Sequence, residues 1–315
     1  MKKLFKLAFL FFIAACLLIS CGKDERSRGS PSSGLVLETA VSPFRTTRGE
    51  TVVVESTVRM AKAGQVKTEA RLLIPGKGPE SLLLREVESA NPAEKKFRGE
   101  IKMDSNAPEG LYTLTVTVVQ GSQQAISKGS FLLGNLIGDF TILSSFATDD
   151  PEKDMRAYFE EFKKSGGNLV ILHSLITADR AYYPSAVCLK PAAAGSPEDR
   201  IGLALKLAAE YGLTALLSVS WDMTREMPYS ECLDSTKKII NELWNFYGDE
   251  PALAGFYNYQ EGSGTYLVWQ MREFCAAAKS HDRGLLTACA PYIDDPLLAG
   301  YLAAIDDLDI VIYQG

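Results

Sequence analysis

A glutamate and two tyrosines recur at a spacing of two residues near the end of an apolar segment, residues 253–261. If this segment is a strand, its alternation places Tyr257, Tyr259 and Glu261 on one face. A carboxyl group among aromatic rings has a raised pKa and can donate a proton near neutral pH. Glycosidases use one such carboxyl to protonate the leaving oxygen and a second as nucleophile or base. Glu261 is therefore the candidate general acid/base, although a carboxylate at this point can equally cap the helix predicted to follow.

Three further residues that can contact a sugar follow other predicted strands. His173 lies at the end of residues 168–174 and can bind a hydroxyl or relay a proton, or it can be a purely structural histidine. Trp221 and Asp222 follow residues 213–220. An indole is a stacking platform for a pyranose and a carboxylate binds its hydroxyls, whereas loop packing and a turn would explain the same pair. The pattern predicts that all three residues bind substrate.

The elements that must position these residues alternate between strands and helices. Nearly continuous apolar runs predict strands covered on both faces, and amphipathic segments between them predict helices. The predicted strands are residues 139–144, 168–174, 213–220, 253–261, 284–290 and 308–313. Polar residues follow the strands, and no glycine-rich nucleotide loop follows the first one. This favours a TIM-type (β/α)8 barrel over a doubly wound open sheet.

The chain reaches Gly315 at the end of its sixth predicted strand, whereas an eight-unit barrel has two more. We therefore expect residues 138–315 to form a barrel that is truncated at its carboxyl end. The second carboxylate of a glycosidase pair is expected beyond Gly315, so the fragment is expected to be inactive alone.

Several motifs in this part resemble one known family. Residues 249–257 (DEPALAGFY) with Glu261, residues 290–292 (APY) and residues 309–315 (DIVIYQG) are together similar to the "domain of unknown function 4434" family. The resemblance implies a glycoside-hydrolase-type TIM barrel. Carried over by position, it implies that the site residues are Tyr257, Glu261, Tyr292 and Gln314, with Trp221 as an aromatic residue after the third strand. Phe256 stands where the family often has Trp.

Residues 35–133 predict a separate, all-β domain. Alternating or β-branched segments are divided by turn signals such as residues 75–79 (PGKGP) and 106–110 (NAPEG). About seven short strands in this length fit an Ig-like β-sandwich. Residues 107–114 (APEGLYTL) resemble the late hairpin of bacterial Ig-like modules, which are usually spacers or supports.

The amino terminus reads as a targeting segment. A basic start and an apolar run predict a lipoprotein signal peptide over residues 1–20, and residues 18–21 (LISC) resemble a lipobox, with Cys21 as the lipidated residue. A plain secretory signal or a short membrane anchor is the alternative. The remainder of residues 21–34 predicts a flexible tether, and residues 22–25 (GKDE) resemble the surface-export tag of Bacteroidota lipoproteins. The expected location is the outer membrane, facing the cell surface or the periplasm.

Charge and cysteine content limit the possible partners. Residues 35–133 carry 13 Lys/Arg and 11 Asp/Glu, whereas residues 139–315 carry 14 and 26. An acidic second domain argues against nucleic acid as a partner. Two histidines and no zinc-type cysteine spacing argue against a transition metal, and no cofactor is expected.

Cys188 and Cys232 can form a disulfide in an oxidising compartment, and Cys275 and Cys289 are expected in the core.

Two hypotheses of different class follow. The first is a surface-anchored, glycoside-hydrolase-like enzyme that acts on a polysaccharide or oligosaccharide, with Glu261 as acid/base. The second is a non-catalytic glycan-binding or scaffold lipoprotein of the same fold. Turnover that depends on Glu261 distinguishes the first hypothesis from the second.

Overall fold

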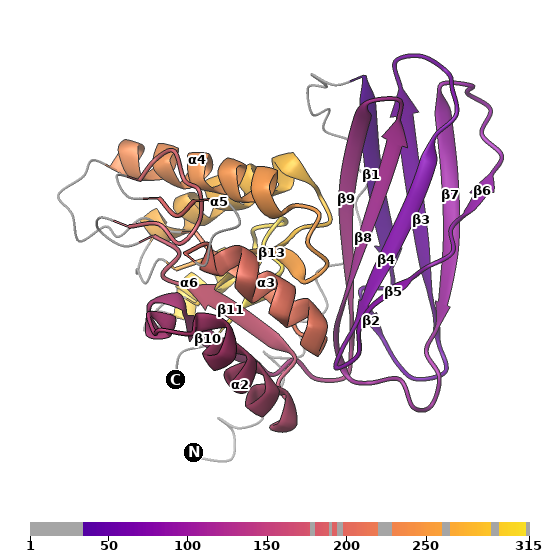
Figure 1. The fold of residues 1–315 in the computed structure, drawn as a ribbon. Helices are drawn as coiled ribbons and strands as arrows, with labels where there is room; N and C mark the ends of the chain where they lie inside the picture. The colour runs from indigo at the N-terminus through magenta and orange to yellow at the C-terminus, as the bar shows by residue number, and fades with distance from the viewer. Residues whose placement is uncertain are drawn as a thin grey trace, which may run out of the picture.

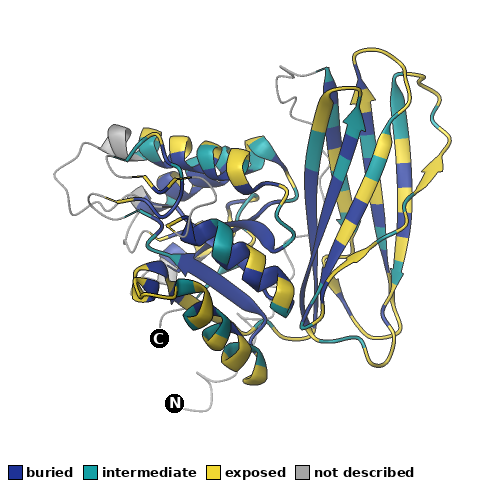
Figure 2. Cartoon of the chain, in the orientation of Figure 1, coloured by how far each residue is buried: buried dark blue, intermediate teal, exposed yellow. Residues whose placement is uncertain are grey.

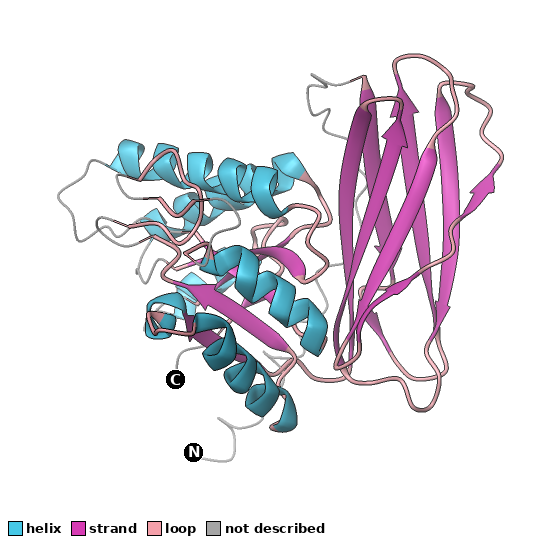
Figure 3. Ribbon diagram, in the orientation of Figure 1, coloured by secondary structure: helices cyan, strands magenta, loops and turns pink. Residues whose placement is uncertain are grey.

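Over the residues that the structure describes, the chain forms three β-sheets and five α-helices (Figure 1). The computed structural model describes residues 34–176, 180–188, 191–193, 198–219, 229–259, 265–290 and 296–312. Two sheets make up the amino-terminal part, and the third is combined with the described α-helices. Figure 3 separates the two parts clearly, with cyan helices beside only one of them.

The amino-terminal part is a β-sandwich with a shared apolar core. Its first sheet has the strand order β1-β3-β7-β6, and its second has the order β2-β9-β8-β4-β5, in which only β2 and β9 are parallel neighbours. The strands are β1 (Leu35–Ser42), β2 (Arg45–Thr46), β3 (Thr51–Met60), β4 (Lys67–Ile74), β5 (Gly78–Ser81), β6 (Arg85–Val87), β7 (Glu94–Lys102), β8 (Gly110–Gln120) and β9 (Gln123–Leu133). Alternate residues of β3 are buried, including Val52 and Val54, and they share the core with Leu114 and Phe131 of the second sheet. The strands outnumber the seven predicted because β2, β5 and β6 are too short to give a periodic signal.

The second part contains a parallel sheet whose strand order follows the sequence, β10 to β15. Its strands are β10 (Gly138–Ile142), β11 (Leu169–His173), β12 (Thr214–Ser218), β13 (Leu253–Asn258), β14 (Leu286–Cys289) and β15 (Ile310–Val311). The connections contain the 3-10 helix η1 (Leu143–Phe146) and the helices α2 (Pro151–Lys164), α3 (Arg200–Tyr211), α4 (Tyr229–Tyr247), α5 (Thr265–His281) and α6 (Pro296–Ala303).

Local signals fix the ends of the first two of these α-helices. The Asp150 carboxylate accepts a hydrogen bond from the Lys153 amide, and Pro151 occupies the first helical turn of α2. The Asp199 carboxylate caps α3 in the same way, and Gly212 ends it in the left-handed conformation at φ 66°. Gly212, at the carboxyl end of α3, lets the chain turn into the next strand, β12 (Thr214–Ser218).

The parallel sheet is an open half-barrel, so the predicted fold class is wrong in its second part, where a TIM-type (β/α)8 barrel truncated at its carboxyl end was expected over residues 138–315. Among the described residues β10 pairs only with β11 and β15 only with β14, which leaves two edges. The sequence pattern specifies βα units, but closure requires pairing between the first and last strands of a barrel. The observed fold is a multidomain α/β protein rich in sheet.

The half-barrel has a different apolar cluster on each face. Toward the helices, Val170, Leu217 and Phe256 belong to the larger cluster. Toward the inside, Ile171, Leu216 and other residues form a smaller one, which also contains Leu111 and Leu132. Because these two leucines lie on β8 and β9, the sandwich supplies part of the inner core of the half-barrel.

The sandwich meets the half-barrel at the amino ends of its strands. The Thr214 hydroxyl, at the start of β12, donates to the Leu111 carbonyl at 2.9 Å. Lys128 of β9 is fully buried here, and its Nζ donates to the Thr115 hydroxyl at 2.8 Å and to the Glu250 carbonyl at 2.6 Å. Residues 127–133 are all buried, and the corresponding half of β9 is dark blue in Figure 2. The opposite, carboxyl ends of the parallel strands are left for a functional site.

Candidate functional site

Aromatic side chains gather on the inner face of the half-barrel toward the carboxyl ends of its strands. They come from three strands and the residue after one of them: Phe140 of β10, His173 of β11, Tyr257 of β13 and Tyr259. Strand register brings His173 and Tyr257 level, because Leu172 pairs with Leu217 and Ser218 of β12 pairs with Tyr257. Phe140 pairs with Ile171 and so lies two residues before His173 on the same face of the sheet. In open parallel sheets, ligands bind at the carboxyl ends of strands.

A register shift between β12 and β13 aims Tyr257 inward. The shift falls between Ala215 and Leu216, and it leaves Ala254 of β13 outside the regular pairing. Ala254 and Tyr257 then face the inner cluster, while Phe256 packs toward the helices. The bulge thus sets which side chain of β13 reaches the site.

The four rings form a continuous row with edge-to-face geometry. The Phe140 ring centroid lies 5.3 Å from that of Tyr257 and 6.2 Å from that of His173, with interplanar angles of 69° and 81°. The His173 and Tyr259 centroids are 4.1 Å apart at 82°. Because β11 and β12 separate β10 from β13, the contact between Phe140 and Tyr257 also shows how strongly the sheet curves.

The row runs from the core to the surface. Tyr257 is buried, whereas Phe140 and Tyr259 are 38% and 40% exposed. Exposed rings beside a histidine give a ligand both an apolar platform and a hydrogen-bonding group.

Ser174 holds the histidine ring and has an unusual backbone. Its φ is 59°, in the left-handed region, where a residue other than glycine is strained. Its Oγ lies 2.9 Å from Nδ1 of His173. Such strain concentrates at functional sites. Sequence reasoning missed Ser174, because nothing in the sequence marks a left-handed serine; the only signal was its place directly after a strand-end histidine.

The predicted site residues divide into two groups. His173 and Tyr257 are both in the row, joined through Phe140, which the sequence did not single out. Glu261, Trp221, Asp222, Tyr292, Gln314 and Cys21 lie outside the described residues. Asn258, at the end of β13, is a further buried polar residue that the sequence reasoning overlooked.

Three described carboxylates in the half-barrel part accept hydrogen bonds that stabilise the local structure. Asp150 caps α2. Asp199 accepts from the Gly202 amide and, at 2.6 Å, from the Tyr247 hydroxyl, whose pKa is raised by burial and by this bond. Glu242 of α4 accepts from the Tyr183 and Ser185 hydroxyls at 2.9 and 2.8 Å and from the Ala186 amide. These three carboxylates therefore stabilise the segments that connect the strands of the parallel sheet.

Cysteines and metal-binding side chains add no second site in the described part of the chain. Cys188 is a free thiol, and the side chain of Cys232, its predicted partner, lies outside the described part of the chain. Cys275 and Cys289 are buried, as expected, and burial raises the pKa of each thiol to about 12. No group of three His, Cys, Asp or Glu side chains among the described residues can hold a metal ion.

No protein-family model matches the sequence, and neither does any curated protein. Among solved structures, the chain is similar to a family 123 glycoside hydrolase from Clostridium perfringens, with 10% identity, a TM-score of 0.36 and coverage of 89% of this chain and 67% of that one. It is also similar to a family 5 glycoside hydrolase from Bacteroides vulgatus, with 16% identity, a TM-score of 0.38 and coverage of 52% and 38%. At these TM-scores the similarity carries no argument, and the resemblances to the 4434 family and to Ig-like modules stay predictions.

Among the helices in the described ranges, none combines the length and the apolar character that a membrane crossing needs.

Proposed function

We propose that this protein binds carbohydrate at the carboxyl ends of its parallel strands and hydrolyses a glycosidic bond there, with Glu261 as general acid/base. The observation that supports binding is the row of rings from Tyr257 to Tyr259. Its exposed members can stack on the apolar face of a sugar, and His173 can bond a hydroxyl. Tyr257, Trp221, Asp222, Tyr292 and Gln314 are the further substrate-binding candidates.

The proposed acid/base role of Glu261 rests on its position two residues beyond Tyr259. A carboxyl at this end of β13 would lie among aromatic groups, whose low polarity raises a carboxyl pKa toward the working range of a general acid. A second carboxylate is also required for hydrolysis, and the separation between the two would decide whether configuration at the sugar is retained or inverted.

Hydrolysis of a panel of neutral polysaccharides by the full-length natural protein and by its Glu261→Gln variant tests the proposal. Reducing sugar should be released by the unmodified chain and should fall at least about 100-fold in the variant, since a general acid contributes roughly 10²–10⁴-fold. Equal rates in both would remove Glu261 from the mechanism.

A second candidate function is glycan binding without turnover. It is favoured because Asp150, Asp199 and Glu242 all accept structural hydrogen bonds, and we therefore assign none of these three carboxylates a role in hydrolysis. Retention of glycan in affinity electrophoresis, lost in Tyr259→Ala, with no product from any form of the protein, would identify a binding protein.

We also propose an outer-membrane lipoprotein anchored through Cys21 and displayed at the cell surface, on the basis of residues 18–25 (LISCGKDE). Labelling with a palmitate analogue in the natural host should mark the protein but not Cys21→Ser. Protease treatment of intact cells then separates surface display from a periplasm-facing orientation.

A further inference from the structure

A serine and a histidine lie within hydrogen-bonding distance of each other at the carboxyl end of β11. Ser174 Oγ is 2.9 Å from Nδ1 of His173, inside the range of roughly 2.6–3.2 Å that separates a nucleophile from its base in enzymes of this kind. Both residues are partly exposed, so both are accessible from solvent. The glycosidase mechanism proposed above makes no use of the Ser174 hydroxyl.

The backbone of Ser174 also resembles that of a serine nucleophile. Its φ of 59° lies in the left-handed region, which strains a residue other than glycine. In α/β-hydrolases the nucleophilic serine lies on a strained turn directly after a parallel strand, and the turn presents Oγ at the end of the sheet. Ser174 follows β11 directly, although residues 172–176 (LHSLI) lack the flanking glycines of those enzymes. The strain therefore falls where such enzymes carry their nucleophile.

The next amide along the chain can stabilise an oxyanion. Among the hydrogen bonds of the described residues, the Leu175 carbonyl accepts from the Tyr182 amide, whereas the Leu175 N–H donates to no acceptor. Leu175 is buried, and a buried N–H without an acceptor is uncommon. In α/β-hydrolases the N–H of the residue after the nucleophile is one of the donors to the oxyanion of the tetrahedral intermediate. Leu175 occupies that position after Ser174.

The surroundings of the pair favour a neutral ester carried by a sugar. The ring centroids of Tyr259 and Phe140 lie 4.1 Å and 6.2 Å from that of His173, and both rings are exposed. They give a sugar that carries the acyl group a platform beside the pair. Residues 139–315 carry 14 Lys/Arg and 26 Asp/Glu, and this excess of negative charge disfavours a phosphate or sulfate ester.

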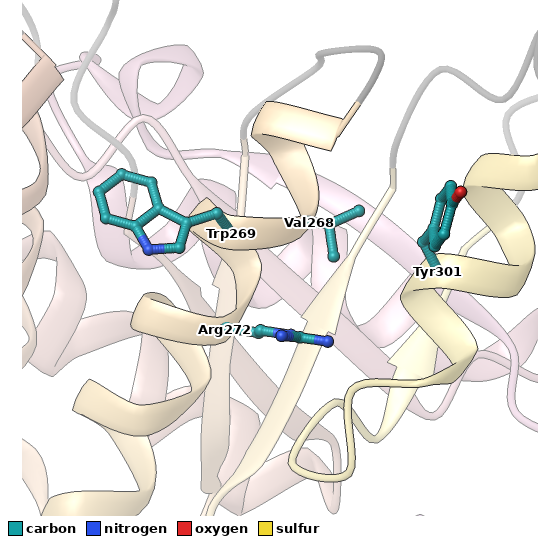
Figure 4. A pocket seen from close by; sticks show the side chains of 4 residues that line it. All are labelled: Val268, Trp269, Arg272 and Tyr301. Atoms are coloured by element: carbon teal, nitrogen blue, oxygen red, sulfur yellow. The ribbon is translucent and has the colours of Figure 1, made fainter.

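A cavity between helices α5 and α6 offers no comparable chemistry. It has a volume of about 180 Å³ and is lined by Val268, Trp269, Arg272 and Tyr301. In Figure 4 the Trp269 indole is directed away from Tyr301, so the two rings do not face a common ligand. None of the four lining residues is a histidine or a carboxylate, whereas a nucleophile and a base lie together at the end of β11.

We propose that Ser174 and His173 form a catalytic pair that removes acyl groups from the hydroxyls of a glycan. This is a second activity at the strand ends, and only the choice of a glycan as carrier of the ester rests on the proposed function. Cleavage of the ester itself requires neither Glu261 nor a second carboxylate.

The reaction takes place in two acyl transfers. With the imidazole proton on Nε2, Nδ1 of His173 accepts the hydroxyl proton while Ser174 Oγ forms a bond to the ester carbonyl carbon. The bond from that carbon to the sugar oxygen then breaks, and the proton passes from Nδ1 to the sugar oxygen. Water attacks the acyl-serine and gives a proton to Nδ1, which returns it to Oγ as the carboxylic acid leaves. One ester and one water thus give one acid and one glycan hydroxyl.

The test is hydrolysis of p-nitrophenyl acetate, acetylated xylan and acetylated mannan by the full-length natural protein. Ser174→Gly removes the nucleophile, and glycine adopts φ 59° without strain, so the fold is retained. Release of nitrophenol and acetate should fall at least about 100-fold in Ser174→Gly and in His173→Gln, since a positioned base contributes roughly 10²–10⁴-fold. Ser145→Ala is the matched control, because Ser145 is exposed on η1 at the same end of the sheet and should leave the rates unchanged.

A fluorophosphonate probe provides a measurement on the unmodified protein. A nucleophilic serine oxygen displaces fluoride from the phosphorus atom, so mass spectrometry should find the adduct on Ser174 and find none in Ser174→Gly. The proposal is overturned if none of the esters is cleaved faster than in buffer. It is also overturned if Ser174→Gly cleaves them at the unmodified rate, or if the adduct is on another residue.

Reducing sugar measured in the same reactions separates this activity from the proposed glycosidase. Acetate released without reducing sugar would support ester cleavage and count against glycosidic hydrolysis. Reducing sugar released without acetate would overturn ester cleavage and leave the glycosidase proposal standing.

Discussion

The Ser174 hydroxyl oxygen lies 2.9 Å from Nδ1 of His173, the residue directly before it, and the serine reaches this position only through a left-handed backbone. The hydrogen bond orients an imidazole that also contacts Tyr259 edge to face. One nitrogen of the ring is thereby engaged within the chain, which limits the rotation of the imidazole. The strained backbone of Ser174 and the restricted orientation of the His173 ring are thus parts of the same local arrangement.

A pair of substitutions at Ser174 should separate backbone strain from the hydroxyl contact. Ser174→Ala and Ser174→Gly both lose the hydrogen bond, but only glycine adopts φ 59° without strain. We expect the glycine variant to be more stable than the alanine variant by about 1 kcal/mol in urea unfolding, the reverse of the usual order in strands and helices. Both variants should bind glycan more weakly. A glycine variant less stable than the alanine variant would contradict the left-handed conformation.

Phe140 should matter for binding more than for stability. Phe140→Leu conserves most of the apolar volume, so the free energy of unfolding should change by less than about 1.5 kcal/mol. The ring contacts to Tyr257 and His173 are lost, however, and glycan retention should fall. Phe44→Leu in the sandwich is the control, because Phe44 is 38% exposed like Phe140. Equal retention in the two variants would exclude the ring row as the binding surface.

The buried Lys128 should make stability depend on pH. Burial lowers its pKa to about 7, from an ordinary value of 10.5, despite nearby Asp282, Asp249 and Glu250. Between these two values the unfolded chain holds a proton that the folded chain has released. Stability should therefore rise with pH from about 7 upward, by at most about 1.4 kcal/mol per pH unit.

Urea unfolding at pH 7 and pH 9 measures this effect. The range ends at pH 9 because the buried thiols of Cys275 and Cys289 oppose the trend above it, since their raised pKa values keep protons in the folded state. Asp282, whose pKa burial raises to about 6, titrates below the range. Lys128→Met should abolish the rise between the two pH values. A rise of the same size in Lys128→Met would assign it to other groups.

Two glycines provide a matched test of the contact between the two parts. A Cβ at Gly284 would collide with the Lys128 carbonyl oxygen, whereas a Cβ at Gly300 in α6 would meet nothing within 4 Å. Gly284→Ala should destabilise the protein by about 1–3 kcal/mol or more, because backbone has to move. Gly300→Ala should stabilise it by up to about 1 kcal/mol through helix propensity. Thermal unfolding of both variants measures the difference, and a neutral Gly284→Ala would mean that the contact is loose.

The sequence predicted those features that depend on local pattern. The apolar run 168–174 became β11 over Leu169–His173, and the histidine at its end lies in the candidate site. The spacing of Tyr257 and Tyr259 likewise placed two aromatic side chains beside the same site. The first result follows from strand periodicity, which a short stretch of sequence contains, whereas Tyr259 lies just beyond the end of β13.

Features that depend on distant pairing were not predictable in this way. The open edges at β10 and β15 are decided by which strands meet, not by the composition of either strand. Lys128 looks like a solvated residue on an alternating strand, yet residues far along the chain bury it. Ser174 has a conformation that its residue type disfavours, and only tertiary contacts can impose it.

The packing of Leu111 and Leu132 limits how one of the two parts could be exchanged by recombination. They belong to the sandwich by chain position but to the half-barrel by packing. A recombination event that exchanged one part for a homologous module would have to bring matching leucines with it, or leave a void beneath the strands. We therefore expect the residues at these two positions to covary with the half-barrel residues that they contact.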